Sequence, residues 1–520
     1  MKSRGVIAAG HEKTVEAAAI ILRDGGNAFD AVLAALFTAC VSESVLASLG
    51  GGGFLLCHTR DERNVVYDFF TQTPNQKRNG AECHFYPIHA DFGTVKQEFH
   101  IGMGSIATPG TVKGIFSIHR DLCTLPITKI VEPAIMLARQ GVRVNALQAL
   151  IYRIIEKIYL STNGARAVFS SKVSDGHLPF EDEVMRYPEL ANTLELLALE
   201  GEPLFYEGEI AQFLVRDCHE NGGHLTADDL RGYRVHKRKP LDITYRNTRL
   251  LTNPPPSFGG ILMGFSLKLL EQCDLRALGF GSVPYLQLLA STMASTNKAR
   301  IESKLAETIE STGAESLLNE KLLRRYRHDI LGRASCQRGT THISVIDANG
   351  NMASLTVSNG EGCGYVVPGT GIMLNNMLGE EDINPRGFDS WPVNSRMSSM
   401  MSPTLAFTDK SDVIVTGSGG SNRIRTALLQ VLINLIDFDM TVEDAVEGSR
   451  IHFEDGMLNV EYGFDPTGID ELVASFPNHK AWKEKNIFFG GAHTAAYNLQ
   501  SKTLSGAGDP RRGGICTVIT

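Results

Sequence analysis

The segment "RGTTHISVIDANGNMASLTVSNG", Arg338–Gly360, decides the fold of this chain. Apolar and polar residues alternate in Thr341–Asp347 and again in Met352–Ser358, which predicts the two strands of a β-hairpin. Asn349-Gly350 lies between them and predicts a tight type I′ turn, because both residues tolerate positive φ. A Gly-Thr-Thr sequence, residues 339–341, therefore stands at the mouth of the hairpin.

Thr340 gains a chemical advantage if the peptide bond before it is cut. An interior Thr hydroxyl is a weak nucleophile, whereas an N-terminal Thr carries its own base, an α-amine with a pKa of about 7.7–8.0. Gly339 has no Cβ, so the Thr340 hydroxyl can reach the preceding carbonyl for an N→O acyl shift. His342 projects on the same strand face, and we expect it to be structural rather than a base. Taken alone, the spacing favours an ordinary strand entrance, since Thr is common in strands.

The composition is that of an ordinary globular protein. The 520 residues are 43% hydrophobic and 21% charged, enough for one large layered domain or two to three compact units. The formal net charge is −8 and the basic runs are short, which argues against nucleic-acid binding. The nine cysteines are scattered and form no CxxC pair. We therefore expect neither a metal site nor a disulfide framework, and reduced thiols in a cytosol are favoured.

Two apolar stretches bear on targeting. The opening "MKSRGVIAAGHEK" contains only Val6–Ala9 as an apolar run, which is too short for a signal peptide. The longest apolar stretch, "FDAVLAALFTACV", is too short to span a bilayer and predicts a buried helix. We therefore expect a cytoplasmic protein with no membrane partner.

Helix and strand signals alternate along the chain. Lys13–Asp24 has helical spacing and ends at Gly25-Gly26, and Asn27 can cap a second helix from Ala28 to Cys40. Residues 412–437 combine a strand, a glycine turn and an amphipathic helix. This alternation predicts α/β layers rather than a helix bundle or an all-β sandwich.

Three glycine-rich stretches are candidates for ligand loops. "GMGSIATPG", residues 102–110, opens no helix, as a dinucleotide fingerprint requires, and "SLGGGGF", residues 48–54, lacks the Lys-Ser/Thr of a phosphate loop. "GSGGSNRIR", residues 417–425, lies between a strand and a helix, where backbone N–H groups can converge on an oxyanion. A packing turn is the alternative there. No cofactor is expected.

An ordered series of motifs runs along nearly the whole chain. In order, the motifs are "GVIAAGHEKTVEAAAIILRDGGNAFDAVLAA", "SLGGGGF", "TPGTVKG", "FYEGEIA", "NGGHLTADDL", "PPPSFGG", "TTHISVID", "GIMLNN", "SSMMSPT", "GSGGSNRI" and "GAGDPRR". This series resembles the γ-glutamyltransferase family of N-terminal-nucleophile hydrolases. The resemblance implies an α+β fold, a four-layer αββα sandwich with extra helices on the large chain. It also implies autoproteolysis at Gly339–Thr340 into a large chain, residues 1–339, and a small chain, residues 340–520, that stay associated.

The resemblance assigns the catalytic roles residue by residue. Thr340 is the nucleophile freed by the cut. Ser358 stands where the family has a second Thr that assists the nucleophile, and it keeps the hydroxyl. The oxyanion donors are the backbone N–H groups of Gly420 and Ser421 if no gap is allowed, or of Gly419 and Gly420 by motif.

Phe70 is the main departure from the family. Members that act on γ-glutamyl compounds carry an Arg in a "DFRE" motif, which pairs with the glutamyl α-carboxylate, whereas this chain reads "DFFTQTP". An apolar ring thus replaces a charge-assisted fork. A buried carboxylate facing Phe70 would be costly unless Arg396, Arg423 or Arg425 binds it.

Two further pocket positions are altered. Glu380 or Glu381 falls near the acidic residue that takes the substrate α-amino group in the family, and Glu is longer than the family's Asp. The substrate-contacting Asn of the family aligns with Gly360, and Asn359 sits beside it. The catalytic machinery is therefore expected to be present and the substrate pocket to be rebuilt.

The serine pair of the family is ambiguous in this chain. Ser399 matches one serine and Met400 falls where the second is expected, whereas a one-residue insertion would keep Ser398-Ser399 intact.

Three functions stay open. The first is a self-cleaving γ-glutamyltransferase or hydrolase that opens glutathione-like amides through a threonyl ester. The second is an amidohydrolase of the same family that acts on another small acid amide, such as an oxamate-type amide. The third, which the intact "GTTHIS" makes least favoured, is an uncleaved homologue that only binds. The resemblance implies a small-molecule amide as partner, and a homodimer of the two-chain unit is compatible with it.

Overall fold

The computed structural model describes residues 4–91, 96–302, 318, 323, 339–384, 387–388 and 390–520. The basic run "RRYRH" at residues 324–328, and Arg338 at the start of the opening segment, lie outside the described residues.

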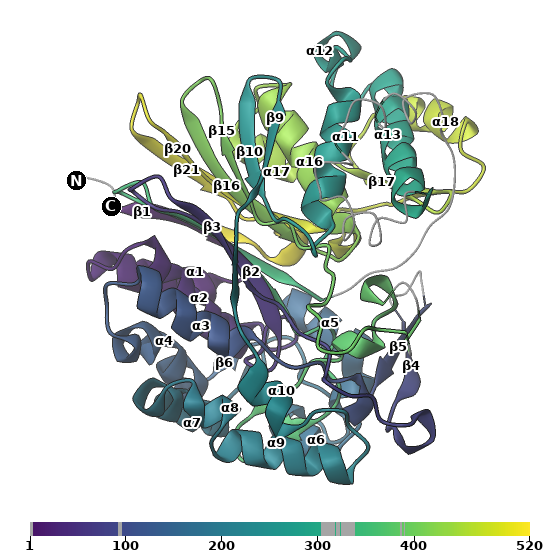
Figure 1. Ribbon diagram of the computed structural model, residues 1–520. Helices are drawn as coiled ribbons and strands as arrows, with labels where there is room; N and C mark the ends of the chain where they lie inside the picture. Colours follow the sequence, from purple (N-terminus) through teal and green to yellow (C-terminus); the bar gives the residue numbers. More distant parts are fainter. Residues whose placement is uncertain are drawn as a thin grey trace.

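Two antiparallel sheets, stacked face to face, form the centre of the protein (Figure 1). The first has the strand order β22-β1-β11-β12-β2-β3-β8, and the second has the order β21-β20-β16-β15-β10-β9. In the order just given, the strands of the first sheet are Ile515–Ile519, Gly5–Ala9, Thr341–Asp347, Met352–Ser358, Gly52–His58, Asn64–Phe69 and His236–Arg238. Those of the second sheet, again in order, are Thr503–Ala507, Gly491–Asn498, Asp412–Gly419, Thr404–Phe407, Thr248–Thr252 and Leu241–Tyr245.

Helices cover the outer face of each sheet. On the first sheet, α1 (Glu12–Arg23), α2 (Ala28–Ser42) and α3 (Thr111–Leu122) contact the strands. On the second, the contacts come from α11 (Gly259–Leu270), α16 (Arg423–Ile436) and α17 (Val442–Glu447), and α13 (Val283–Glu302) packs on α11. The order helix, sheet, sheet, helix confirms the expected αββα sandwich.

Further helices extend the first half of the chain. Those below the first sheet in Figure 1 are α4 (Ile127–Gln140), α5 (Ala146–Tyr159), α6 (Asn163–Phe169), α7 (Pro188–Glu200), α8 (Pro203–Tyr206), α9 (Glu209–Glu220) and α10 (Ala227–Gly232). The small peripheral elements are α12 (Leu275–Leu278), α18 (Pro466–Ala474), and strands β4 (Tyr86–Asp91), β5 (Lys96–Ile101), β6 (Val142–Arg143), β7 (Val184–Met185), β13 (Val366–Val367), β14 (Ile372–Met373), β17 (Ile451–Glu454), β18 (Met457–Val460) and β19 (His479–Ala481). The extra helices lie before residue 340, as expected.

Residues before and after Thr340 share both sheets. Strands β1, β2, β3 and β8 of the first sheet and β9 and β10 of the second precede it, and the other strands of both sheets follow or start beside it. β11 itself pairs with β1 on one side and with β12 on the other. The two parts of the chain on either side of residue 340 are therefore interlocked by backbone hydrogen bonds.

Both faces of the first sheet are buried. In β1, Ile7 joins the core under α1 and α2, whereas Val6 joins the core between the sheets. In β2, Leu55 and Phe54 divide in the same way. All residues of α2 are buried, as its apolar sequence predicted. Among the described helices, we find none with the length and apolarity needed to span a bilayer.

The local predictions from the sequence hold for most elements. The hairpin strands have the predicted bounds. Asn27 caps α2 in a capping box with Asp30, whose carboxylate accepts the backbone N–H of Asn27. The strand, turn and helix predicted over residues 412–437 are β16 and α16.

The predicted type I′ turn of the hairpin is wrong. Only Gly350 of the pair has a positive φ, 85°, and residues 348–351 separate the two strands. The Asp347 carboxylate shapes it, because it accepts the backbone N–H groups of Asn349 at 2.8 Å and Asn351 at 3.0 Å. The same carboxylate accepts the backbone N–H of Ala28, at the start of α2, at 3.0 Å. One buried side chain thus fixes both the loop and the helix beneath it.

We expect Asp347→Ala to destabilise the protein by about 2–4 kcal/mol, because it leaves the buried backbone N–H of Ala28 and the partly buried N–H groups of Asn349 and Asn351 without their acceptor. Differential scanning calorimetry should show a lower Tm. Asp61→Ala, which changes an exposed aspartate in the turn between β2 and β3, is the control and should leave Tm unchanged. Equal midpoints for the two variants would contradict this role of Asp347.

Candidate active site

Thr340 lies in a small cavity at the mouth of β11. Its side chain is 4% exposed, and the cavity has a volume of about 30 Å³. The predicted site residues that line this cavity together with Thr340 are Phe70, Gly339, Ser358, Glu380, Ser399, Met400 and Ser421. The cavity is thus small while Gly339 is in place.

Side chains bind both the N–H and the carbonyl group of Gly339, the residue before Thr340. The Ser358 hydroxyl donates to the Gly339 carbonyl oxygen at 2.6 Å and itself accepts the backbone N–H of Gly360 at 3.0 Å. The Gly339 N–H donates to Glu361 Oε1 at 2.7 Å. The Gly339 carbonyl is therefore polarised, and the residue is fixed at both its N–H and its carbonyl group.

Two buried ionisable residues contact the two threonines. Arg512 donates to the Thr340 carbonyl oxygen at 3.2 Å, and the Thr341 hydroxyl donates to Glu43 at 2.6 Å. Burial lowers the pKa of Arg512 to about 10, against the carboxylates of Asp509, Glu361 and Glu43. Burial also raises the pKa of Glu43, and this outweighs its hydrogen bonds from hydroxyl groups.

A buried network of ion pairs includes Arg511, the residue before Arg512 in the chain. Arg511 pairs with Glu461 at 2.6 Å and with Asp509 at 3.1 Å, and Arg450 pairs with Asp509 at 2.7 Å. Burial would raise the pKa of Asp509, but the two guanidinium groups outweigh it and hold this pKa below its usual range. The "GAGDPRR" motif thus positions Arg512 against Thr340.

The glycine turn after β16 reaches the same point. A Cβ on Gly419 would stand 2.1 Å from the Thr340 carbonyl oxygen, so only glycine permits this approach. Gly420 and Ser421 both have positive φ, 118° and 51°, before α16 begins at Arg423. Of the three candidate oxyanion residues, Ser421 lines the cavity.

His342 is a structural residue, as expected. It is fully buried between the sheets, with Nδ1 2.8 Å from the Thr356 hydroxyl and Nε2 3.0 Å from the Ser344 hydroxyl. Burial holds its pKa well below the usual range. A Cβ on Gly417 would stand 2.1 Å from the ring, so the ring fills the space between β11 and β16.

Glu380 rather than Glu381 points into the cavity. Glu380 is buried and lines the cavity, whereas Glu381 is exposed. Gly360 makes room for it: with φ 64°, a Cβ there would stand 2.3 Å from Glu380 Oε1 and 2.1 Å from Asn376 Oδ1. The two departures from the family, at 360 and 380, are therefore coupled in space.

Phe70 belongs to an apolar part of the cavity lining. Its ring stacks on Phe54 with 5.4 Å between centroids, and Met377, Ile383, Met400, Met401 and Ile424 complete the apolar lining. Among the described residues that line the cavity, none is Lys, Arg or His.

The three arginines considered as substitutes for the family's Arg are engaged elsewhere. Arg396 pairs with Asp68 at 3.3 Å and donates to the Phe70 carbonyl and to the Tyr233 hydroxyl. Arg425 pairs with Glu454 at 2.9 Å. Arg423 is buried with its guanidinium 5.1 Å from the centre of the Phe488 ring.

The structure leaves some predicted site residues outside the cavity, and it shows contacts to Gly339 and Thr340 from residues that the sequence did not predict. The predicted residues that do not line it are Asn359, Glu381, Gly419, Gly420 and Arg423. The missed residues closest to the reaction are Glu361 and Arg512, which contact Gly339 and Thr340. A carboxylate between two glycines in "NGEG" was the only signal for Glu361, and "GAGDPRR" carried Arg512 without a role.

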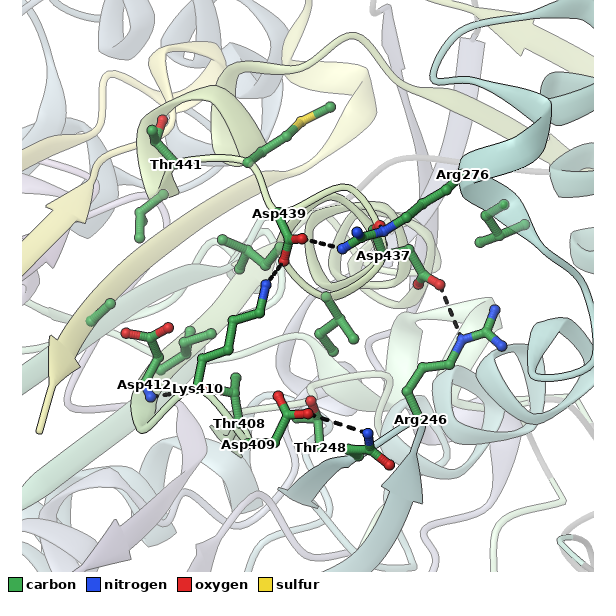
Figure 2. A pocket seen from close by; sticks show the side chains of 18 of the residues that line it. Arg246, Thr248, Arg276, Thr408, Asp409, Lys410, Asp412, Asp437, Asp439 and Thr441 are labelled. Atoms are coloured by element: carbon green, nitrogen blue, oxygen red, sulfur yellow. Dashed lines mark hydrogen bonds and ion pairs between the residues drawn. The ribbon is translucent and has the colours of Figure 1, made fainter. Parts of the chain in front are cut away.

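A second, larger pocket lies away from these residues. It has a volume of about 950 Å³ and lies between the second sheet and the C-terminal end of α16. Figure 2 shows its charges in pairs: Asp439 faces both Lys410 and Arg276, and Arg246 lies 3.1 Å from Asp437. No predicted site residue lines it. In the described part of the chain, no group of three or more His, Cys, Asp or Glu is arranged to hold a metal.

Comparison with known proteins shows the family of this chain. The family model described as Gamma-glutamyltranspeptidase matches residues 14–519. The Acylase ACY 1 proenzyme of Pseudomonas sp. (strain V22) is 30% identical over 542 residues, covering 100% of this chain and 94% of that protein. The Glutathione hydrolase proenzyme of Escherichia coli (strain K12) is 30% identical over 549 residues, covering 98% of this chain and 90% of that protein.

Solved structures share the fold. Cephalosporin acylase from Bacillus halodurans superposes with a TM-score of 0.85 at 22% identity, covering 99% of this chain and 96% of that chain. Gamma-glutamyltranspeptidase of Helicobacter pylori gives a TM-score of 0.55 at 27% identity, covering 62% of this chain and 90% of that chain. These relatives are enzymes, and the family match spans nearly the whole sequence. The chain therefore belongs to the gamma-glutamyltranspeptidase family of N-terminal-nucleophile hydrolases and is an enzyme of that family.

Proposed function

We propose that this enzyme cuts its own chain at Gly339–Thr340 and then uses Thr340 to hydrolyse a small amide whose acyl group lacks the glutamyl α-carboxylate. One observation carries the substrate assignment: the described lining of the Thr340 cavity is apolar around Phe70 and contains no cation. The similarity to an acylase proenzyme supports the same class.

The self-cleavage step follows from the contacts of Gly339. The Thr340 Oγ attacks the Gly339 carbonyl carbon, an ester C–O bond forms, the C–N bond breaks, and the hydroxyl proton passes to the leaving nitrogen. The Ser358 hydroxyl, 2.6 Å from the carbonyl oxygen, stabilises the charge that develops on it. Water then hydrolyses the ester, which leaves a carboxylate on Gly339 and a free α-amine and hydroxyl on Thr340.

The turnover step uses the new α-amine. The neutral amine takes the proton of the Thr340 hydroxyl, Oγ forms an acyl ester with the substrate, and the leaving amine receives the proton. We assign the oxyanion site to the backbone N–H groups of Gly420 and Ser421, because Ser421 lines the cavity and Gly419 packs on the Thr340 carbonyl. Water resolves the ester in hydrolysis, and an amine resolves it in transfer.

A second candidate is a γ-glutamyl hydrolase or transferase. The similarity to a glutathione hydrolase proenzyme favours it, as does Glu380, which keeps a carboxylate for a substrate ammonium group. The large segment, residues 1–339, and the small segment, residues 340–520, would stay associated in either case, since they share both sheets. The cytoplasmic location stays a proposal.

The purified protein should consist of two fragments, the smaller beginning at Thr340, when its intact mass is measured. Thr340→Ala should remain one chain and be inactive, because it lacks the attacking oxygen, whereas Thr340→Ser should cleave slowly. Thr341→Ser, which keeps the hydroxyl that donates to Glu43, is the control and should cleave normally. A wild-type chain that stays whole after prolonged incubation refutes self-cleavage.

Phe70→Arg should raise kcat/KM on γ-glutamyl anilides by about ten- to a hundredfold, because it adds a charge-assisted hydrogen bond to the α-carboxylate. Phe70→Leu removes the ring without adding a charge and should give no such gain. Initial rates for the three proteins on γ-glutamyl anilide and on a panel of small carboxyl-amides measure the effect. Efficient turnover of glutathione by the unmodified enzyme would overturn the substrate assignment.

Glu380→Gln should lower kcat/KM by about tenfold for amides whose acyl group carries an ammonium, because it removes the partner charge from the cavity. Matched amides without the amino group should be affected little. Glu381→Gln is the control, since Glu381 is exposed beside the cavity. Equal losses on both substrate types would show that Glu380 supports the cavity wall rather than recognising an ammonium group.

A further inference from the structure

Glu361 holds the residue whose carbonyl is attacked. Its side chain is 3% exposed, and Oε1 accepts the Gly339 N–H at 2.7 Å. Its own backbone N–H donates to Asn376 Oδ1 at 2.9 Å, which fixes the turn after β12. A Cβ on Gly339 would stand 3.0 Å from Glu361 Oε2 and 2.9 Å from the Gly360 carbonyl oxygen. The carboxylate therefore encloses residue 339 closely enough to favour glycine.

A carboxylate acts differently on the two states of Gly339. While the chain is whole, Gly339 offers an N–H, and a charged acceptor makes a stronger hydrogen bond to it than a neutral one. Ser358 holds the carbonyl end of the same residue at 2.6 Å. Both ends of residue 339 are thus fixed before the attack, which favours a reactive geometry.

Hydrolysis of the ester changes the interaction between Glu361 and Gly339 from attraction to repulsion. Once the ester is cleaved, Gly339 carries a carboxylate beside that of Glu361, in a cavity with room for little water. Like charges repel strongly at such a site. Arg512 already faces the carboxylates of Asp509, Glu361 and Glu43, so a further negative charge is poorly compensated by it.

We infer that Glu361 is a positioning residue with two successive effects: it holds the Gly339 N–H for the attack, and it repels the new Gly339 carboxylate. When Gly339 leaves, the space that it occupies in the Thr340 cavity becomes available to the acyl group of the substrate. This inference rests on the proposed self-cleavage at Gly339–Thr340 and adds a residue to which the motifs quoted above assign no role.

The first test is the rate of self-cleavage, measured by intact mass after synthesis. Glu361→Ala should slow it by about tenfold or more, because it removes a hydrogen bond to a charged acceptor. Glu361→Gln keeps an acceptor oxygen and should be slowed less, and it also covers the case in which the Ala variant fails to fold. Asp30→Asn is the matched control: Asp30 is a buried carboxylate that accepts backbone N–H groups at the opposite end of the hairpin, so its loss should leave the rate unchanged.

The second test measures the repulsion in cleaved protein, independently of activity. The synthetic hexapeptide of residues 334–339, "ASCQRG", is titrated by calorimetry as the C-terminal carboxylate and as the C-terminal amide. Wild-type enzyme should bind the amide about tenfold or more tightly than the carboxylate, and Glu361→Gln should remove this preference. A merely structural role would not produce a preference that depends on the peptide's end charge.

The outcomes separate the two proposals. Uncleaved wild-type protein refutes the proposed function. Cleaved wild type with an equally fast Glu361→Ala variant overturns the holding role of Glu361. Equal binding of both peptides to the wild type, or an unchanged preference in Glu361→Gln, overturns the repulsion.

Discussion

Burial of the β11–β12 hairpin on both faces is the constraint on which the rest of the structure depends. One face packs on α2 and the other on β16 and β20, so a slip of one residue would exchange its two buried sets of side chains. The register is therefore fixed, and it places Ser358 opposite Thr340 at the open end of the hairpin. Asp347 fixes the other end by binding the loop and the first residue of α2. Thr340, the nucleophile that we propose, thus stands at the end of a hairpin whose two strands are buried along their whole length.

The same burial sets the electrostatics of the site. Glu43, Glu361 and Glu380 are buried close to Thr340, and Arg512 is the cation that contacts its carbonyl. Arg512 is held in turn by its position beside the Arg511, Asp509 and Glu461 network. In such a site, each change of charge during the reaction meets little screening by water, so the placement of a single carboxylate matters.

The departures from the family form one connected change rather than scattered substitutions. Phe70 packs on Phe54 where the family has an arginine, and the backbone carbonyl of Phe70 accepts hydrogen bonds from Arg396 and Tyr233. On the other side, the absence of a side chain at Gly360 leaves the space that Glu380 fills. The cavity beside Thr340 thus has an apolar wall on one side and a carboxylate longer than the family's Asp on the other, and this is the basis of the acyl group that we propose.

The sequence by itself determined the features that depend on neighbouring residues. The strands of the hairpin, the Asn27 cap and the helix after the glycine turn follow from spacing over a few positions, and the motif order indicated the sandwich. Tertiary structure alone decided the features in which distant segments meet. The turn type was mispredicted because the Asp347 carboxylate binds the loop and is itself tied to a helix start 319 positions away in the chain. The sequence allowed Arg396 to bind a substrate carboxylate, whereas in the fold it pairs with Asp68. Glu361 and Arg512 reach Gly339 and Thr340 across 22 and 172 positions, and no local pattern encodes such contacts.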